Sequence, residues 1–288
     1  MRHFRLPLAF AALLAVARAA FDPAAFNAAV ELYNRRQVAE AQAAFEALAR
    51  VNPDNANIQF YLGRLALQRN DHEQAVPYLK KAVALVPNDA RFHQRLGDAY
   101  GLAAQKAGMF SSIGFASKCK AEYEKAVELD PKNIDARLGL VSFYQQAPGF
   151  AGGSMEKAHA QAEEIKKLDA SRGRAAIAGL YAAEKKNDLA FAEFEDALKD
   201  NPEDYSALYQ FGRLAAITGE RMDRGLEALR KCLTLTPPEG QHGQAAAHWR
   251  IGLILEKKGD QAGARAAYEA ALRSDPKFSQ AAESLKKL

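Results

Sequence analysis

The side chains best able to support catalysis or metal binding are the histidines and cysteines, and their spacing supports neither activity. Five histidines follow residue 20: His72, His93, His159, His242 and His248. None pairs with another His, Cys, Asp or Glu at a metal-ligand spacing such as HExxH or CxxC. The nucleophile pattern GxSxG is also absent. We therefore predict no catalytic residue, no metal site and no enzymatic activity.

A glycine-rich stretch, residues 145–158, has the composition of a phosphate-binding loop but not its order. The sequence GxxxxGK[ST] is missing, and no strand-like pattern precedes the glycines. Ser154, just before Met155, is better suited to cap the start of a helix. We expect no cofactor to bind this stretch or any other.

The element that must position the remaining residues is a repeated pair of helices, seen most clearly in residues 56–89. Apolar side chains follow helical spacing on each side of Asn70-Asp71. Pro87 stops the second pattern because proline lacks an N–H and disfavours helical geometry in the preceding residue. Such stops recur at similar intervals, 34 residues from Pro53 to Pro87, 35 from Pro202 to Pro237 and 39 from Pro237 to Pro276.

The copies also share a pattern of residue types. Their key positions are Leu62-Gly63, Ala75, Leu79, Ala82, Pro87; Leu96-Gly97, Tyr100, Tyr123, Ala126, Pro131; Phe211-Gly212, Leu229, Cys232, Pro237; and Ile251-Gly252, Ala264, Tyr268, Ala271, Pro276. This pattern resembles the tetratricopeptide repeat (TPR) family over roughly residues 22–278. The resemblance implies an all-α, TPR-type α-solenoid of about seven helix–turn–helix repeats, closed by a C-terminal capping helix over 279–288. The repeats are expected at about 22–55, 56–89, 90–133, 134–170, 171–204, 205–239 and 245–278.

Glycine recurs at one position of the first helix in four copies. A glycine inside a helix costs about 1 kcal/mol relative to alanine. Its recurrence therefore indicates a packing requirement, and we predict that the two helices of a unit approach so closely there that a Cβ would clash.

The amino terminus has the plan of a secretory signal peptide. A short basic segment precedes the apolar run Leu6–Val16, and Ala17-Arg18-Ala19 gives an A-x-A-like end. The apolar run is shorter than the roughly 20 residues that span a bilayer. The alternative interpretation is a first, capping helix of the solenoid. We predict a signal peptide over 1–19, cleaved after Ala19, and hence a periplasmic or secreted protein without a stable membrane span.

Charge and cysteine content narrow the range of partners. The chain has 39 basic and 35 acidic residues, and loss of Arg2, Arg5 and Arg18 with the leader would leave 36 basic residues, a net charge of +1. The sequence contains no clustered basic footprint, so we expect no nucleic-acid partner. Cys119 and Cys232 lie about three repeats apart, and each repeat contacts only its neighbours. We expect both to be buried free thiols.

Two insertions interrupt the period, one in the third unit and one in the fourth. The first carries Met109, Phe110 and Phe115, and the second carries Phe150. In one interpretation the helices are extended and these side chains pack on a neighbour. In the other, loops near 108–115 and 148–153 expose an apolar edge on which the phenylalanines form one cluster.

In the TPR family, the first helix of each unit lines a concave groove that holds peptides or protein segments. Carried over by position, the resemblance implies seven partner-binding residues: Phe60, Arg64, Gln94, Asp98, Tyr209, Arg213 and Trp249. Aromatic and arginine side chains commonly carry interface energy. The lysine and asparagine clamp of members that bind chaperone tails does not appear at these positions, so that ligand is not expected.

Two functional hypotheses follow. The first is a non-enzymatic scaffold or adaptor that binds a peptide or partner protein in the groove, in the periplasm or outside the cell. The second is a small-molecule or glycan binder, or an accessory subunit of an envelope complex, that uses the insertion edge. Neither hypothesis identifies the partner.

Overall fold

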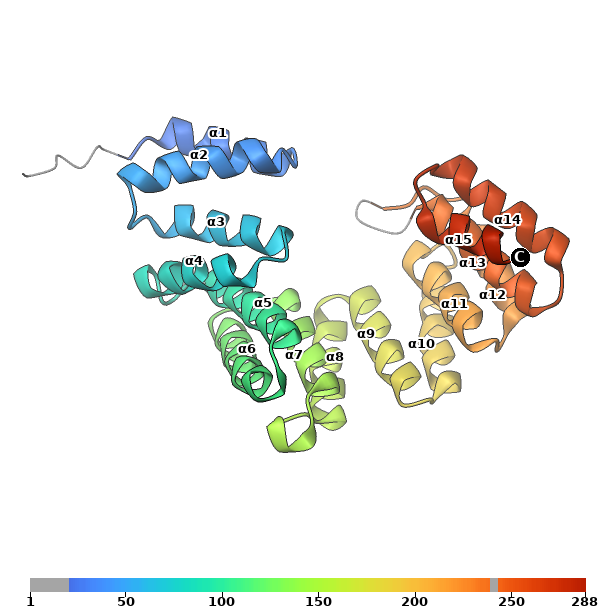
Figure 1. The fold of residues 1–288 in the computed structure, drawn as a ribbon. Helices are drawn as coiled ribbons and strands as arrows, with labels where there is room; N and C mark the ends of the chain where they lie inside the picture. The colour runs from blue at the N-terminus through green and yellow to red at the C-terminus, as the bar shows by residue number, and fades with distance from the viewer. Residues whose placement is uncertain (1–20, 239–242) are drawn as a thin grey trace, which may run out of the picture. The chain divides into compact units, whose positions relative to one another are not determined.

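The computed structural model describes residues 21–238 and 243–288. These residues form fifteen α-helices and one short 3-10 helix, with no β-strand among them (Figure 1). Contacts divide the chain into two compact units, unit 1 (Met1–Phe115) and unit 2 (Ala116–Leu288), which are described separately.

Unit 1 is a series of antiparallel helices joined by short turns. Its helices are α1 (Pro23–Asn34), α2 (Val38–Val51), α3 (Ala56–Gln68), α4 (His72–Leu85), α5 (Ala90–Lys106) and the start of α6 (Met109–Leu129). From α1 to α5 each helix contacts the next, and α3 also contacts α5. The first helices α3 and α5 therefore lie side by side.

Unit 2 continues the same plan. Its helices after α6 are α7 (Ile134–Gln146), η1 (Gly149–Ala151), α8 (Met155–Leu168), α9 (Ala170–Ala183), α10 (Asn187–Asp200), α11 (Tyr205–Thr218), α12 (Met222–Cys232), α13 (Gln244–Lys257), α14 (Gln261–Ser274) and α15 (Ser279–Lys287). The first helices α7, α9, α11 and α13 again contact one another in order.

The predicted all-α architecture of about seven helix pairs and a closing helix is confirmed. The last helix, α15, packs against α14. Ala281 of α15 is fully buried in a cluster with Tyr268 of α14. This contact covers apolar surface that the last pair would otherwise expose to water, which stabilises the end of the array.

Asp and Asn side chains set the starts of several helices. Asn55 accepts hydrogen bonds from the N–H groups of Asn57 and Ile58 at 3.0 and 3.2 Å, and Asp89 accepts one from Arg91 at 2.9 Å. Such caps satisfy N–H groups that have no partner within the helix. The predicted cap at Ser154 is confirmed, since its Oγ accepts from the Lys157 N–H at 3.2 Å.

The close approach predicted at the repeated glycine is confirmed in both units. A Cβ on Gly63 of α3 would overlap Leu79 of α4, and a Cβ on Gly212 of α11 would overlap Leu229 of α12. Both leucines are fully buried. Because glycine has no Cβ, a leucine of the second helix can pack directly against the backbone of the first helix.

Of the two interpretations of the first insertion, extended helices are confirmed and a loop near 108–115 is wrong. The helix α5 extends to Lys106, and α6 begins at Met109, so residues 109–115 are helical. No proline interrupts this stretch, and a Cβ at Gly114 would meet open space, so neither backbone nor packing forces a break. The second insertion does form a turn, centred on η1.

Other sequence predictions have mixed outcomes. Cys119 and Cys232 are both buried and neither is in a disulfide bond, as predicted. The predicted signal peptide over 1–19 lies outside the described residues, and so does His242. None of the helices in the described ranges has both the length and the apolar character needed to cross a membrane.

Candidate partner-binding sites

A pocket of about 430 Å³ lies in unit 1 across the first helices of three successive pairs. Its lining comes from α1 (Phe26), α3 (Asn57, Phe60, Tyr61 and Arg64) and α5 (Arg91, Gln94 and Arg95). Side chains three or four residues apart share one face of a helix, which explains how α3 and α5 each present a stripe to this pocket. We call it the unit-1 pocket.

We call the aromatic residues of the lining, Phe26, Phe60 and Tyr61, the floor of the unit-1 pocket, and the buried rings of Phe45 and Phe92 pack against them. The rings of Phe45 and Tyr61 stack with centroids 4.8 Å apart, and Phe26 meets Tyr61 edge-on at 5.9 Å. Phe60 and Phe92 lie 4.8 Å apart. Rings held against one another in this way lose little further freedom when a ligand packs on them.

Among the three arginines that line the pocket, Arg64 differs in having no carboxylate partner in the described part of the chain. Its guanidinium lies 4.5 Å from the Tyr33 ring centre and 5.3 Å from that of Tyr61. Within the described part of the chain, no carboxylate forms an ion pair with Arg64. Aromatic faces attract a guanidinium without neutralising it. Arg64 is therefore free to pair with an acidic group of a ligand.

The other two arginines of the pocket already have carboxylate partners. Arg91 binds Asp89 at 2.6 Å, and Arg95 binds Asp98 at 2.9 Å. The hydrogen bond from Arg91 lowers the pKa of Asp89 below its ordinary value. Because of these intramolecular ion pairs, Arg91 and Arg95 would attract an acidic group of a ligand less strongly than an unpaired arginine would.

Three of the predicted residues line the unit-1 pocket: Phe60, Arg64 and Gln94. Phe60 and Gln94 are 5% and 7% exposed, so each presents only an edge of its side chain. Asp98 lies outside the lining and acts instead on Arg95.

Five lining residues escaped the sequence analysis: Phe26, Asn57, Tyr61, Arg91 and Arg95. Helical spacing would have found four of them, because each lies three residues before a predicted residue: Asn57, Tyr61, Arg91 and Arg95. Phe26 carries a weaker signal, since the first copy of the repeat has Ala29 in place of the glycine.

The predicted residues of unit 2 lie on α11 and α13 and have different surroundings. Tyr209 is only 2% exposed and packs within the core of the unit. Trp249 lines a separate pocket of about 300 Å³ between α13 and α15, and its Nε1 donates a hydrogen bond to Ser284 Oγ at 3.0 Å. Arg213 is partly buried, and its Nε donates to Gln210 at 2.7 Å.

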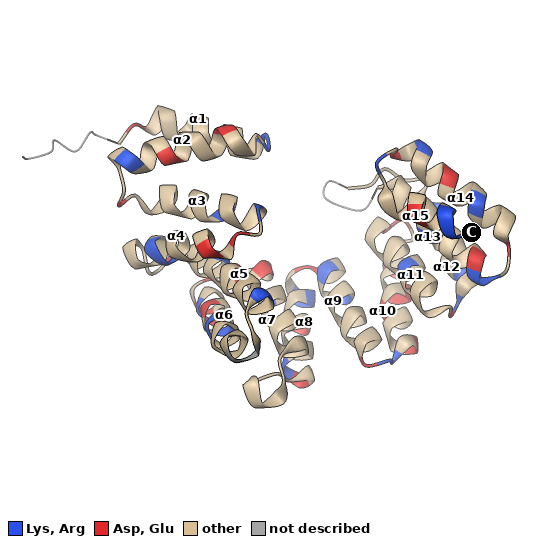
Figure 2. Cartoon of the chain, viewed as in Figure 1, with Lys and Arg blue, Asp and Glu red and all other residues tan. Residues whose placement is uncertain are grey.

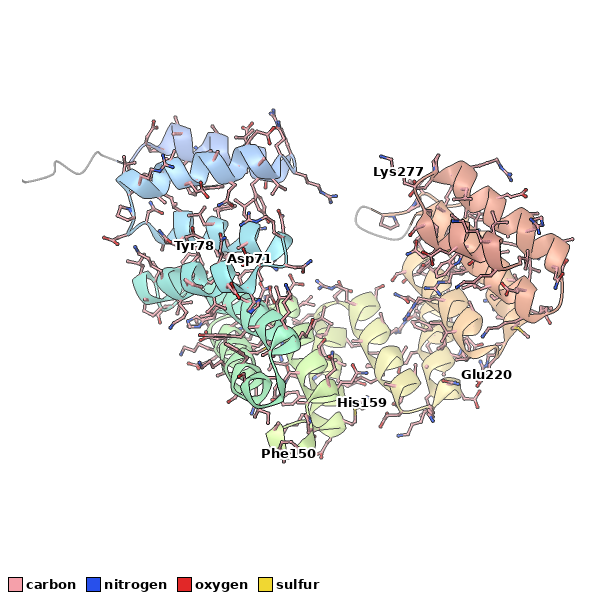
Figure 3. All side chains as sticks on the ribbon, in the orientation of Figure 1. Asp71, Tyr78, Phe150, His159, Glu220 and Lys277 are labelled. Atoms are coloured by element: carbon pink, nitrogen blue, oxygen red, sulfur yellow. The ribbon has the colours of Figure 1, made fainter. Side chains whose placement is uncertain are left out.

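The insertion residues have two outcomes. Phe150 is 84% exposed at the outer end of the turn between α7 and α8 (Figure 3). Phe115 is partly buried, with its ring 6.3 Å from that of Tyr100. The structure does not describe the side chains of Met109 and Phe110. Because Phe115 and Phe150 belong to different units, the predicted cluster remains a prediction.

The charges and polar groups show no concentrated reactive centre. Basic and acidic residues are interspersed along the helices of each unit (Figure 2). Over residues 21–238 and 243–288, no group of three or more His, Cys, Asp or Glu side chains is placed to hold a metal ion. The aromatic and arginine side chains that line the unit-1 pocket can recognise a ligand by aromatic contact and charge.

Comparison with known proteins identifies two segments of the chain. Residues 26–90 and residues 245–278 each match a family described as Tetratricopeptide repeat. The first segment contains most of the unit-1 pocket, and the second contains α13 and α14. No curated protein matches the chain significantly.

Solved structures share the fold at low sequence identity. A tetratricopeptide repeat protein from Parabacteroides merdae is 16% identical, with a TM-score of 0.63 over 91% of this chain and 96% of that one. A thermophilic TPR protein from Thermus thermophilus is 22% identical, with a TM-score of 0.54 over 66% and 97%. PilF from Pseudomonas aeruginosa is 18% identical, with a TM-score of 0.50 over 81% and 97%. These likenesses concern the fold alone.

Proposed function

Because the chain is a tetratricopeptide-repeat protein with an all-α solenoid fold, we propose that it is a non-enzymatic scaffold that binds a segment of a partner protein in the unit-1 pocket. Tetratricopeptide repeats generally bind proteins, and the proteins that contain them are mostly not enzymes. The observation that carries the proposal is the contact of Arg64 with the rings of Phe60 and Tyr61 in the pocket floor, together with the lack of a carboxylate partner for Arg64 in the described part of the chain.

The composition of the pocket favours a protein segment over a small metabolite. Its walls come from three first helices, so the depression follows the direction in which the repeats stack. Aromatic side chains and a guanidinium are the groups that most often anchor protein interfaces. A segment with an apolar side chain beside an acidic one would satisfy both the floor and Arg64.

Site-specific photocross-linking tests this proposal. Asn57 lines the pocket and is exposed, so p-benzoylphenylalanine at this position would face any bound segment. The matched control carries the same group at Arg50 of α2, which is also exposed and lies outside the lining. We expect a partner protein to cross-link from position 57 in an extract of the producing cells, and not from position 50.

A second variant makes the cross-linking specific. Arg64→Gln removes the available cation and should reduce the cross-linked product at least tenfold. The same product from positions 57 and 50, or an unchanged yield with Arg64→Gln, would contradict the proposal.

We also propose that the protein acts in the periplasm or outside the cell. The support is the basic, apolar and A-x-A-like succession of residues 1–19. Sequencing the amino terminus of the protein from its own cells should give Ala20 as the first residue. A chain that starts at Met1, retained with the cytoplasmic fraction, would contradict this proposal.

Phe150 supports a second candidate function, that of an accessory subunit binding through the insertion turn. Covering a phenylalanine that is 84% exposed with a partner removes apolar surface from water, which favours binding. If this turn is the binding element, Phe150→Ser should abolish partner capture while Arg64→Gln leaves capture unchanged. The reverse result would assign binding to the unit-1 pocket.

A further inference from the structure

Two pairs of arginines occupy the same repeat positions in different units. In each pair, one arginine directly follows the repeat glycine of a first helix. The other lies two positions before the glycine of the next first helix. The pairs are Arg64 and Arg95 on α3 and α5, and Arg213 and Arg250 on α11 and α13. The two helices of each pair are in contact.

In unit 1 the chain supplies its own carboxylate to one member of this pair, Arg95. Asp98 follows the glycine of α5 and binds Arg95 Nη1 at 2.9 Å. In unit 2 the residue at the equivalent position, after Gly252, is Leu253. The second pair therefore lacks the acid that the first pair has.

The surroundings of Arg213 and Arg250 leave their charges without a counter-ion. The Arg213 Nε donates only to the neutral Gln210, and the Arg250 guanidinium lies 4.2 Å from the Trp249 ring centre. The Arg250 Nε is buried and has no hydrogen-bond partner. No carboxylate in the described part of unit 2 forms an ion pair with either arginine.

Burial and mutual repulsion make this arrangement unfavourable in the free protein. Burial, and then the positive charge of Arg250, lower the pKa of Arg213 below its ordinary value. Charged groups taken out of water are costly unless they are paired and hydrogen-bonded. An anion placed between the two guanidinium groups would relieve both effects.

We infer that Arg213 and Arg250 form a subsite for the carboxylate of an acidic side chain in a peptide or protein ligand. The carboxylate would take the part that Asp98 has in unit 1, and would accept charge-assisted hydrogen bonds from the two guanidinium groups. Trp249 and Leu253 lie beside Arg250 on the same helix, so an apolar residue next to the acidic one would also find contacts. The subsite shares no residue with the unit-1 pocket and stands on separate observations.

Trp249 provides the readout, because it is the single tryptophan of the chain and lies against Arg250. The probe is acetyl-Gly-Glu-Glu-Gly-amide, titrated into the full chain at low ionic strength. The glutamine version, acetyl-Gly-Gln-Gln-Gly-amide, is the uncharged control. We expect a saturable change in Trp249 fluorescence with the glutamate peptide and at least tenfold weaker binding of the glutamine peptide.

Substitutions of the two arginines test their roles. Arg213→Met and Arg250→Met should each weaken the glutamate peptide at least tenfold. Arg230→Met is the matched control, since Arg230 is an exposed arginine of the neighbouring α12, and it should leave the affinity unchanged. Equal affinities in all three variants would overturn the inference.

The most specific variant gives unit 2 the carboxylate that unit 1 has. Leu253→Asp would neutralise the arginines internally and should weaken the peptide at least tenfold relative to Leu253→Asn. Both variants lose the same apolar contacts, so a general loss of packing affects them alike. Equal binding by the two variants would overturn the inference, and so would a response to inorganic phosphate at matched ionic strength without one to the glutamate peptide.

Discussion

The pair α3 and α5 in unit 1 and the pair α11 and α13 in unit 2 are built on one plan but differ in charge. Both have a glycine closed against a buried leucine, Gly63 with Leu79 and Gly212 with Leu229. In unit 1 Asp98 neutralises Arg95, whereas Leu253 leaves Arg250 without an acid. The packing positions repeat because sterics restrict them, while the partly exposed positions of the same helices are free to vary.

The largest expected loss of stability comes from truncating the leucines that pack against the repeat glycines. Leu79→Ala and Leu229→Ala each leave a cavity at a fully buried site and should lower the free energy of unfolding by about 2–5 kcal/mol. Urea unfolding followed by circular dichroism reports on the whole chain, and Trp249 fluorescence reports on unit 2. The equivalence of the two sites would be wrong if only one substitution were destabilising.

Adding a Cβ to the repeat glycine should lower the free energy of unfolding by less than truncating the leucine does. Gly212→Ala would force Leu229 to move and should destabilise by about 1–3 kcal/mol, the range for overpacked cores. Gly179→Ala on α9 is the matched control, because nothing lies within 4 Å of the added methyl group. It should stabilise the protein by up to about 1 kcal/mol through helix propensity. Equal effects of both changes in urea unfolding would refute the packing requirement.

Cys232 distinguishes the units at high pH, because the equivalent position of α4 is Ala82. Burial raises the pKa of the Cys232 thiol from 9.0 to about 12. The folded state thus favours the protonated thiol, and this stability is complete below pH 9 and is lost as pH rises toward 12. Wild type should lose about 1 kcal/mol more than Cys232→Ala between pH 8 and pH 10, by the usual 1.36 kcal/mol per pKa unit. Parallel pH profiles in urea unfolding would contradict the assignment.

The smallest expected effect on stability comes from replacing Asp98, the acid that unit 1 has and unit 2 lacks at the equivalent position. Asp98→Leu gives unit 1 the residue that unit 2 has, and should lower the free energy of unfolding by no more than about 1 kcal/mol, since the pair with Arg95 is partly exposed. It should also raise the affinity of unit 1 for the glutamate peptide, measured by calorimetry in an Arg213→Met background. An unchanged affinity would show that Asp98 does not shield Arg95.

The helix pairs and the glycine contacts were predictable because they follow from periodicity and from sterics. Part of the unit-1 pocket was also predictable, since Phe60, Arg64 and Gln94 lie at repeat positions of first helices. The neutralisation of Arg95 by Asp98 was not predictable, because it depends on side-chain conformations that spacing leaves open. Arg250 was missed for a related reason, since its lack of a counter-ion depends on every element around it.

The insertions show that a glycine alone does not predict where a helix ends. Gly108 does separate α5 from α6, but Gly114 lies within α6, where the residues around it sustain the helix. Between Pro148 and Ser154 the chain does turn, and the backbone is fixed there by the Ser154 N–H donating to the Tyr144 carbonyl at 2.8 Å. A glycine thus marks a break only where neighbouring residues also disfavour a helix.

The most direct test of the difference between the two arginine pairs follows their Nε–H resonances by NMR in one sample. Glutamate peptide is added to ¹⁵N-arginine-labelled protein, with signals assigned through Arg64→Lys, Arg95→Lys, Arg213→Lys and Arg250→Lys. The expected result is that the Arg213 and Arg250 signals shift together at the lowest peptide concentrations, while the Arg95 signal stays in place. Movement of the Arg95 signal before that of Arg250 would show that Asp98 does not neutralise Arg95, and would contradict the account.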